Sequence, residues 1–141
     1  MKSVSLAEAV AAIRLLPQIL PTEEPIGPLT QEAMMKLEAA ISQPFVSFAG
    51  IYPYRFLYHK AAMLFYFVIK DHSMENGNKR SAVIITMYFL YKNGKTFSFS
   101  QESLYEVACL VAESSRDEMD AIIFALKKTF KQYIVDKPIS S

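Results

Sequence analysis

Residues 54–94 read YRFLYHKAAMLFYFVIKDHSMENGNKRSAVIITMYFLYKNG, two apolar stretches separated by a short polar segment. The first stretch, from Tyr54 to about Lys70, is apolar nearly all round, which is typical of a buried helix. The second runs from about Asn78 to Tyr91 and stops at Asn93-Gly94, a common signal for a helix C-terminus. The sequence therefore predicts two central helices joined by a polar loop, residues 71–80.

The rest of the chain predicts further helices, so we expect an all-α fold. Helix starts are indicated by side chains that satisfy the first backbone N–H groups: Ser5 with Glu8, Thr30, Ser100, and Ser115 with Glu118. The first helix is expected to close near Pro17, and the proline-rich connector 21–28 cannot be regular.

Two segments depart from helical periodicity. Residues 43–53 place Phe45, Val46 and Phe48 among small residues, which favours an extended loop or short hairpin. Thr96–Phe99 alternates and is expected to be extended as well. We expect one domain over 1–141, with N-terminal helices in 1–42, a core in 43–135 and a frayed tail in 136–141.

Composition excludes several classes of protein. The 141 residues are 52% hydrophobic, enough for a real core, and a net charge of +1 disfavours binding to nucleic acid. One cysteine, Cys109, excludes an internal disulfide, and two histidines are too few for a zinc site. The most apolar stretches, Ala61–Ile69 and Ala82–Tyr91, are about half of the ~20 residues that a membrane span needs. Glu8 and Arg14 interrupt the N-terminal apolar stretch, so we expect no signal peptide and a cytoplasmic protein.

The polar loop carries the residues with the clearest chemistry. Lys79 and Arg80 fall in the first turn of the second central helix, where the helix dipole is positive, so their charges favour a bound anion such as phosphate. Gly77 allows the backbone to approach a ligand, and His72 can take up a proton near neutral pH. The same residues also fit a plain helix turn with solvated cations and a capping histidine, and composition does not decide between the two readings.

The loop resembles a family signature. His72-x-Met74-x-Asn76-Gly77-Asn78-Lys79-Arg80 is similar to the Fic/Doc pattern His-x-Phe-x-Asp/Glu-Gly/Ala-Asn-x-Arg, with its fixed positions in register. The likeness extends from roughly Pro44 to Tyr133. Residues 78–82, Asn-Lys-Arg-Ser-Ala, are similar to the Asn-Lys-Arg-Thr-Ala run of the Doc toxin branch.

The resemblance implies a compact Fic-type helical bundle and a transferase that uses ATP to modify a hydroxyl of a target protein. By position, His72 matches the general base. The nucleotide phosphates would be held by Gly77, Asn78, Lys79 and Arg80. The target-docking flap would contain Phe45, Val46, Ser47 and Phe48. For Phe45 and Phe48, ordinary packing under a loop is an equally good interpretation.

Three positions depart from the family pattern. Met74 replaces the usual Phe as an apolar wedge, and Ser73 replaces a common proline. Asn76 stands where the family has an acidic ligand for Mg²⁺. An amide oxygen can bind Mg²⁺ but lacks the charge of a carboxylate, so metal binding and catalysis both depend on this position.

The resemblance also bears on the reaction and the partners. Lys79 and Val83 resemble the Doc branch, so we expect phosphorylation, with a translation factor such as elongation factor Tu as a candidate target. The alternatives are AMP transfer, or a degenerate Fic fold that binds a nucleotide or a partner without chemistry. The nearest match to the family's inhibitory string is Ser114-x-x-x-Glu118, but Met119 follows it, so we expect a separate antitoxin.

Overall fold

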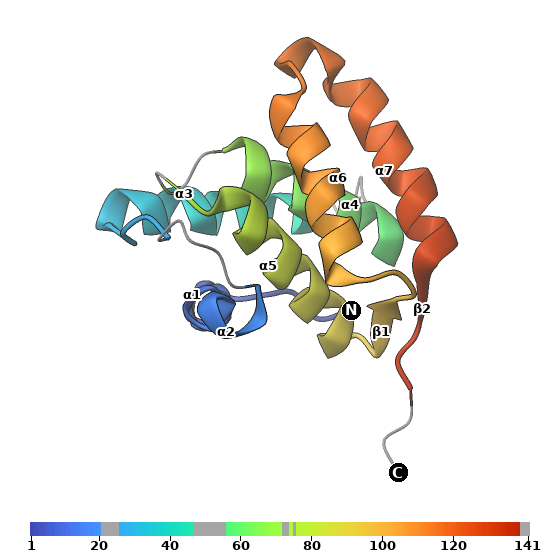
Figure 1. The fold of residues 1–141 in the computed structure, drawn as a ribbon, viewed down its shortest axis with the longest axis horizontal. Coiled ribbons are helices and arrows are strands. Elements are labelled where there is room, and N and C mark those ends of the chain that lie inside the picture. The colour runs from blue at the N-terminus through green and yellow to red at the C-terminus, as the bar shows by residue number, and fades with distance from the viewer. Residues whose placement is uncertain (21–25, 47–55, 72–73, 75, 139–141) are drawn as a thin grey trace.

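The computed structural model describes residues 1–20, 26–46, 56–71, 74 and 76–138 (Figure 1). Within these ranges the elements are α1 (Leu6–Arg14), α2 (Leu16–Ile19), α3 (Gln31–Ser42), the 3-10 helix η1 (Gln43–Phe45), α4 (Leu57–Lys70), α5 (Asn78–Lys92), β1 (Lys95–Phe97), α6 (Gln101–Glu113), the 3-10 helix η2 (Arg116–Glu118), α7 (Met119–Tyr133) and β2 (Ile134–Asp136). The predicted all-α fold class is confirmed. Among the helices so described, none combines the length and the apolar character needed to cross a bilayer.

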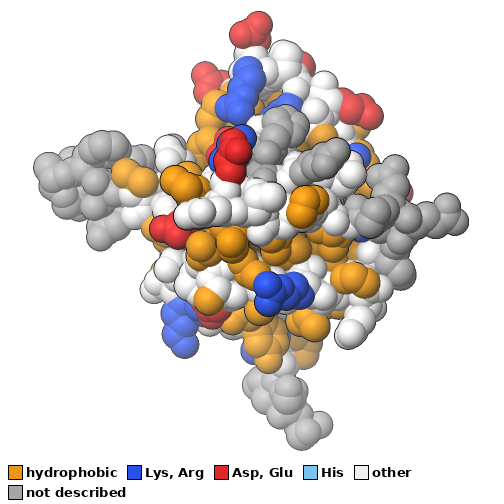
Figure 2. Space-filling model, turned by 90° about the vertical axis from the view of Figure 1, so that its left-hand side faces the viewer, with side chains coloured by type: hydrophobic (Ala, Val, Ile, Leu, Met, Phe, Trp, Pro, Cys, Tyr) orange, Lys and Arg blue, Asp and Glu red, His pale blue; other side chains and the backbone are white. Residues whose placement is uncertain are grey.

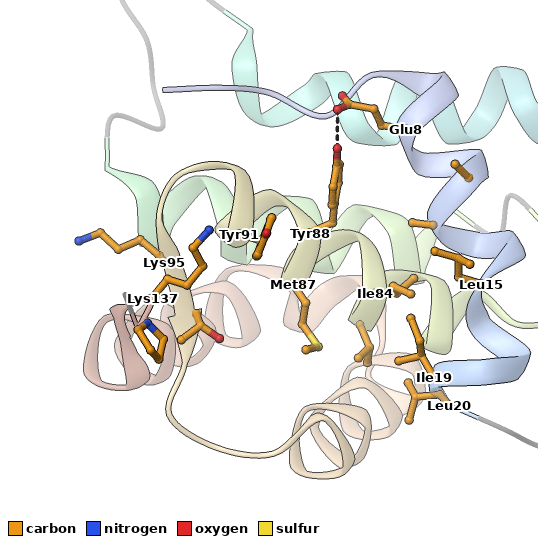
Figure 3. A pocket seen from close by; sticks show the side chains of 15 residues that line it. Glu8, Leu15, Ile19, Leu20, Ile84, Met87, Tyr88, Tyr91, Lys95 and Lys137 are labelled. Carbon is orange, nitrogen blue, oxygen red and sulfur yellow. Dashed lines mark hydrogen bonds between the residues drawn. The ribbon is translucent and has the colours of Figure 1, made fainter. Parts of the chain in front are cut away.

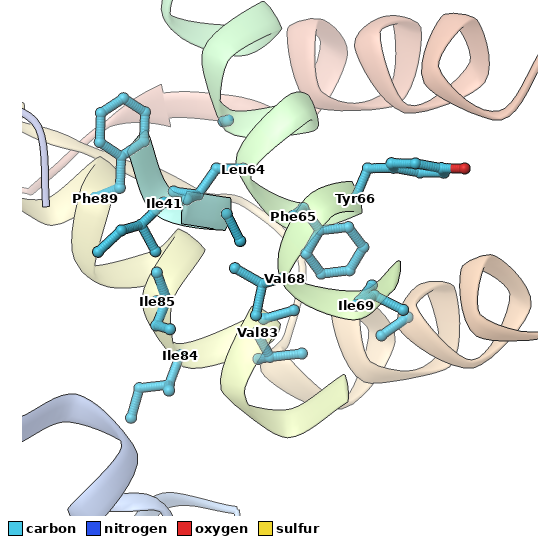
Figure 4. Close-up of a cluster of buried hydrophobic side chains, with 14 of the residues drawn as sticks. Ile41, Leu64, Phe65, Tyr66, Val68, Ile69, Val83, Ile84, Ile85 and Phe89 are labelled. Carbon is cyan, nitrogen blue, oxygen red and sulfur yellow. The ribbon is translucent and has the colours of Figure 1, made fainter. Parts of the chain in front are cut away.

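The two central helices, α4 and α5, form the core. α4 packs against α3, α5, α6 and α7, while α1 and α6 cover α5 (Figure 1). Phe65 and Tyr66 on α4 and Ile85 and Phe89 on α5 are fully buried (Figure 4). The two apolar stretches therefore became central helices, as expected, and the polar loop joins them at one end.

The predicted helix starts are confirmed by hydrogen bonds. The Ser5 hydroxyl accepts from the Glu8 N–H at 3.2 Å, and the Glu8 carboxylate accepts from the Ser5 N–H at 3.0 Å. Thr30 caps α3, Ser100 caps α6, and Ser115 with Glu118 forms a capping box before α7. Pro17 does not simply close the first helix. It is the second residue of the one-turn helix α2, where a missing N–H costs nothing.

Glu8 also joins α1 to α5. Its carboxylate accepts a hydrogen bond from the Tyr88 hydroxyl at 2.6 Å (Figure 3). It also accepts one from the Lys92 ammonium at 2.8 Å. The bond from Lys92, followed by those from Tyr88 and from the Ser5 N–H, lowers the pKa of Glu8 to about 2. The ionised carboxylate is therefore the form that stabilises the fold.

We expect Glu8→Gln to lower the free energy of unfolding at pH 7 by about 1 kcal/mol, the value for a charged hydrogen bond reduced by solvent screening. Because the folded pKa is below the unfolded one, this contribution is present above pH 4.5 and is lost as the pH falls towards 2. Denaturant titrations at several pH values measure the difference. Glu38→Gln, an exposed change on α3, is the control. A wild-type advantage that persisted undiminished at pH 2 would contradict this account.

The extended prediction for residues 43–53 is wrong at its start. Residues 43–45 form the 3-10 helix η1, with Pro44 in its first turn, where proline is well tolerated. The Phe45 ring packs edge-on against Phe89, with 5.5 Å between the ring centroids. Residues 47–53 of this prediction lie outside the described residues.

The C-terminal segment is also more ordered than expected. β1 confirms the predicted extended character of 96–99 for Thr96 and Phe97, whereas Ser98 and Phe99 lie outside the strand. β1 pairs antiparallel with β2, which was not predicted, in the register Thr96↔Val135. Asp136 pairs with Lys95, and the Lys137 N–H donates to the Gly94 carbonyl at 2.9 Å. The expectation that the chain frays from Asp136 is therefore wrong for these two residues, because a second strand holds them. Residues 139–141 are not described.

Candidate functional site

Gly77 makes the turn that leads into α5. It has φ +95°, a left-handed conformation that side chains other than glycine rarely adopt. A Cβ at this position would lie 3.3 Å from Cγ2 of Ile26. The neighbouring Asn76 carbonyl accepts a hydrogen bond from the Gly27 N–H at 3.0 Å. The glycine is thus needed both for the turn and for the close approach of residues 26–27.

Gly77→Ala is expected to lower the free energy of unfolding by about 1–2 kcal/mol for the backbone alone, with a further cost from the Ile26 contact. Gly94→Ala is a matched control, because Gly94 has φ +74° and a Cβ there would meet nothing within 4 Å. Denaturant titrations of both variants separate the two effects. Equal losses would show that the contact with Ile26 contributes nothing.

The Asn78 side chain makes two hydrogen bonds to the backbone of Met74, four residues earlier. Its side-chain oxygen accepts from the Met74 N–H at 3.0 Å, and its NH₂ group donates to the Met74 carbonyl at 2.8 Å. The Met74 side chain is buried, as expected of an apolar wedge. Asn78 therefore has a structural role that the spacing alone did not indicate, namely holding Met74 beside the start of α5. Its phosphate contact stays a prediction.

The first turn of α5, which the structure describes completely, contains no acidic residue and carries two cations. Arg80 is only 7% exposed, and the Lys79 ammonium lies 5.9 Å from the centroid of the Tyr105 ring on α6. The helix dipole and both side chains contribute positive potential here. The arrangement favours an anion with several oxygens, such as a phosphate chain.

Several predicted site residues cannot be placed. His72, Ser73 and Glu75 lie outside the described residues, as do Ser47 and Phe48 of the predicted flap. Of the flap residues that are described, Val46 is half-buried, and Phe45 packs against Phe89 and beneath the Lys60 ammonium, 5.0 Å from its ring centroid. These contacts give Phe45 a packing role, one of the two interpretations that the sequence left open.

The described residues offer little for a resident metal ion. Within them, no group of three His, Cys, Asp or Glu side chains is placed to hold a metal. Asn76 is exposed and supplies one neutral amide oxygen. Mg²⁺ usually takes one or two carboxylates together with substrate phosphates and water, so here the phosphates would have to supply most of the charge.

An apolar groove lies along α5, beyond the loop. It has a volume of about 670 Å³ and is lined mainly by α1, α2 and α5, with residues of β1 and residues that follow β2 at one end (Figure 3). Leu15, Ile19 and Tyr91 on its walls are large and exposed. The sequence analysis missed this groove. The apolar residues Leu15, Ile19 and Leu20 around Pro17 were the available signal. On the face shown in Figure 2, Lys and Arg side chains are scattered rather than gathered in one basic patch.

Fold and site together define a class: an all-α domain with a left-handed glycine and two cations at the start of its second central helix. The model of the Fic/DOC family matches residues 6–90, more than half of the chain, and the chain therefore belongs to the Fic/DOC family. This confirms the resemblance found in the loop.

One curated relative is informative. The chain is 36% identical over 58 residues to Toxin Doc of Mycolicibacterium smegmatis (strain ATCC 700084 / mc(2)155). The match covers 41% of this chain and 45% of the relative, so it spans less than half the length of that protein. No solved structure matches the chain significantly.

Proposed function

We propose that this protein is a Doc-like toxin that transfers the γ-phosphoryl group of ATP to a hydroxyl of a target protein. The observation that carries the proposal is the first turn of α5. There a left-handed glycine is followed by a lysine and a nearly buried arginine, in the turn where the helix dipole is positive. Membership of the Fic/DOC family and the similarity to a protein named Toxin Doc support the same conclusion.

Each residue then has a role in the transfer. His72 removes the proton from the target hydroxyl, whose oxygen attacks the γ-phosphorus. The bond from that phosphorus to the bridging oxygen breaks, and ADP leaves with the electron pair. Lys79, Arg80 and the helix N-terminus stabilise the charge on the phosphate oxygens. Mg²⁺ held by the phosphates and Asn76 would neutralise further charge when bound.

Lys79 and Val83 support phosphoryl transfer over AMP transfer. The Lys79 ammonium adds charge and bulk beside Tyr105. Position 83, in the next turn of α5, holds a fully buried valine instead of a second arginine that could bind a phosphate chain. A nucleotide bound at this turn would therefore contact two neighbouring cations, Lys79 and Arg80. Two cations so close together suit the binding of a terminal phosphate that is presented to the target hydroxyl.

Purified protein incubated with bacterial lysate and ATP, labelled in parallel at the γ- or the α-phosphate, tests the proposal. We expect protein-bound label from γ-labelled ATP only. Label from α-labelled ATP would show AMP transfer. The variant Lys79→Gly, with Lys128→Gly on α7 as its matched control, would show whether Lys79 determines which of the two groups is transferred. No label from either nucleotide, with a folded protein that binds ATP, would favour the degenerate binding protein and overturn the proposal.

The partners follow from the same proposal. A cytoplasmic translation factor such as elongation factor Tu is the proposed target, and a separate antitoxin the proposed inhibitor. The Glu118 carboxylate accepts from the N–H and hydroxyl of Ser115 at 2.9 and 3.1 Å, which lowers its pKa and commits it to a local cap. That engagement argues against self-inhibition through Ser114-x-x-x-Glu118. Expression without an antitoxin should therefore arrest bacterial growth.

A further inference from the structure

The C-terminal end of α4 is tied to the turn between α6 and α7. Lys70 is only 6% exposed although it is the last residue of α4. Its ammonium donates to the carbonyl of Ala112 at 3.3 Å and to the carbonyl of Ser114. These carbonyls belong to the end of α6, where helix carbonyls lack partners and the dipole is negative. The buried lysine is therefore matched to the place where its charge is most favourable.

The turn between α6 and α7 also contacts the end of α4 through a side chain of its own, Arg116. Nη2 of Arg116 donates to the Lys70 carbonyl at 3.1 Å and lies 3.6 Å from a carboxylate oxygen of Asp71. The arginine thus satisfies an end carbonyl of α4 and pairs with the first residue after that helix. Lys70 and Arg116, called here the α4 anchor, connect the same two segments twice, once in each direction.

The turn that carries Arg116 is itself well ordered by short-range bonds. The Ser115 N–H donates to Glu118, closing the capping box, and the Ser114 hydroxyl donates to the Val111 carbonyl at 2.6 Å. A side chain on such a turn presents its guanidinium from a fixed backbone. Because Arg116 is exposed over most of its side chain, its ion pair with Asp71 contributes little to global stability.

The loop that carries the signature residues is consequently held at both ends. Asn78 and Gly27 hold Met74 and Asn76 on the side of α5, and the α4 anchor holds Asp71 on the side of α4. We infer that Lys70 and Arg116 are positioning residues, which fix the start of the loop so that the base following Asp71 meets its substrate. This inference rests on the proposed function.

Arg116→Ala tests the inference, with Arg14→Ala, an exposed arginine on α1, as the matched control. A misplacement of about 1 Å can cost up to about a hundredfold in rate, so we expect kcat to fall at least about tenfold. KM for ATP should stay nearly unchanged, because the α5 side of the loop has its own contacts. Arg116→Lys should restore part of kcat. In a double-mutant cycle with Asp71→Asn, the two losses should not add.

Amide hydrogen exchange provides a readout that does not depend on activity. In Arg116→Ala, exchange should accelerate in peptides covering 71–78 and nowhere else, with the midpoint of unfolding unchanged. An unchanged kcat would overturn the inference, as would a loss of kcat that tracks a loss of global stability. If the wild-type protein transferred nothing, the proposed function would fail, and the exchange experiment would decide alone: faster exchange confined to the loop supports the anchor, and unchanged exchange rejects it.

Discussion

His72→Ala is expected to lower the rate of transfer about a thousandfold, within the range for removal of a general base. The affinity for ATP should be nearly unchanged, because the residues proposed to hold the phosphates follow on α5. Transfer rates measured with saturating γ-labelled ATP, and binding measured by calorimetry, separate the two effects. The reason for the large loss is that no other side chain in the loop has an ordinary pKa near neutrality.

His59→Gln is the matched control for this prediction. His59 lies in the first turn of α4, and burial, followed by the nearby charges of Lys127 and Lys60, lowers its pKa. It is the other histidine of the sequence and belongs to another part of the fold. Full transfer by His72→Ala, or an equal loss in His59→Gln, would remove His72 from its assigned role.

Arg80→Met should weaken ATP binding by at least about thirtyfold, since truncating one partner of a buried charge pair costs at least about 2 kcal/mol. Arg80 is nearly buried at the first turn of α5, where its guanidinium can present two parallel donors to phosphate oxygens. Arg80→Lys keeps the charge without the fork, so its affinity should lie between the two. Calorimetry gives the affinities, and thermal unfolding shows whether each variant is folded. Wild-type affinity in a folded Arg80→Met protein would place the phosphates elsewhere.

Much of the fold follows from short-range patterns. The caps at Ser5, Thr30, Ser100 and Ser115 are bonds over three residues, so a single sequence contains both partners. The strand pair could not be predicted in this way. Its register joins Lys95 to Asp136 across some forty residues, and only β1 is preceded by an expectation from an alternating pattern.

The site was only partly predictable for the same reason. The conformation at Gly77 follows from its residue type, but the neighbour that crowds it, Ile26, comes from the connector after α2. The sequence allowed two interpretations of Phe45, docking of the target or packing in the fold, and did not indicate the contact with Phe89. Lys70 entered the sequence analysis only as the end of a helix, because only the fold brings Ala112, Ser114 and Arg116 to it.

The most direct test of the central claim is mass spectrometry of a target protein modified by the purified wild-type protein, with His72→Ala as the parallel control. A tryptic peptide of the target should gain the mass of one phosphate on a serine, threonine or tyrosine hydroxyl, and only with the wild-type protein. An adduct with the mass of AMP, or a phosphorylated peptide produced equally by His72→Ala, would contradict the account.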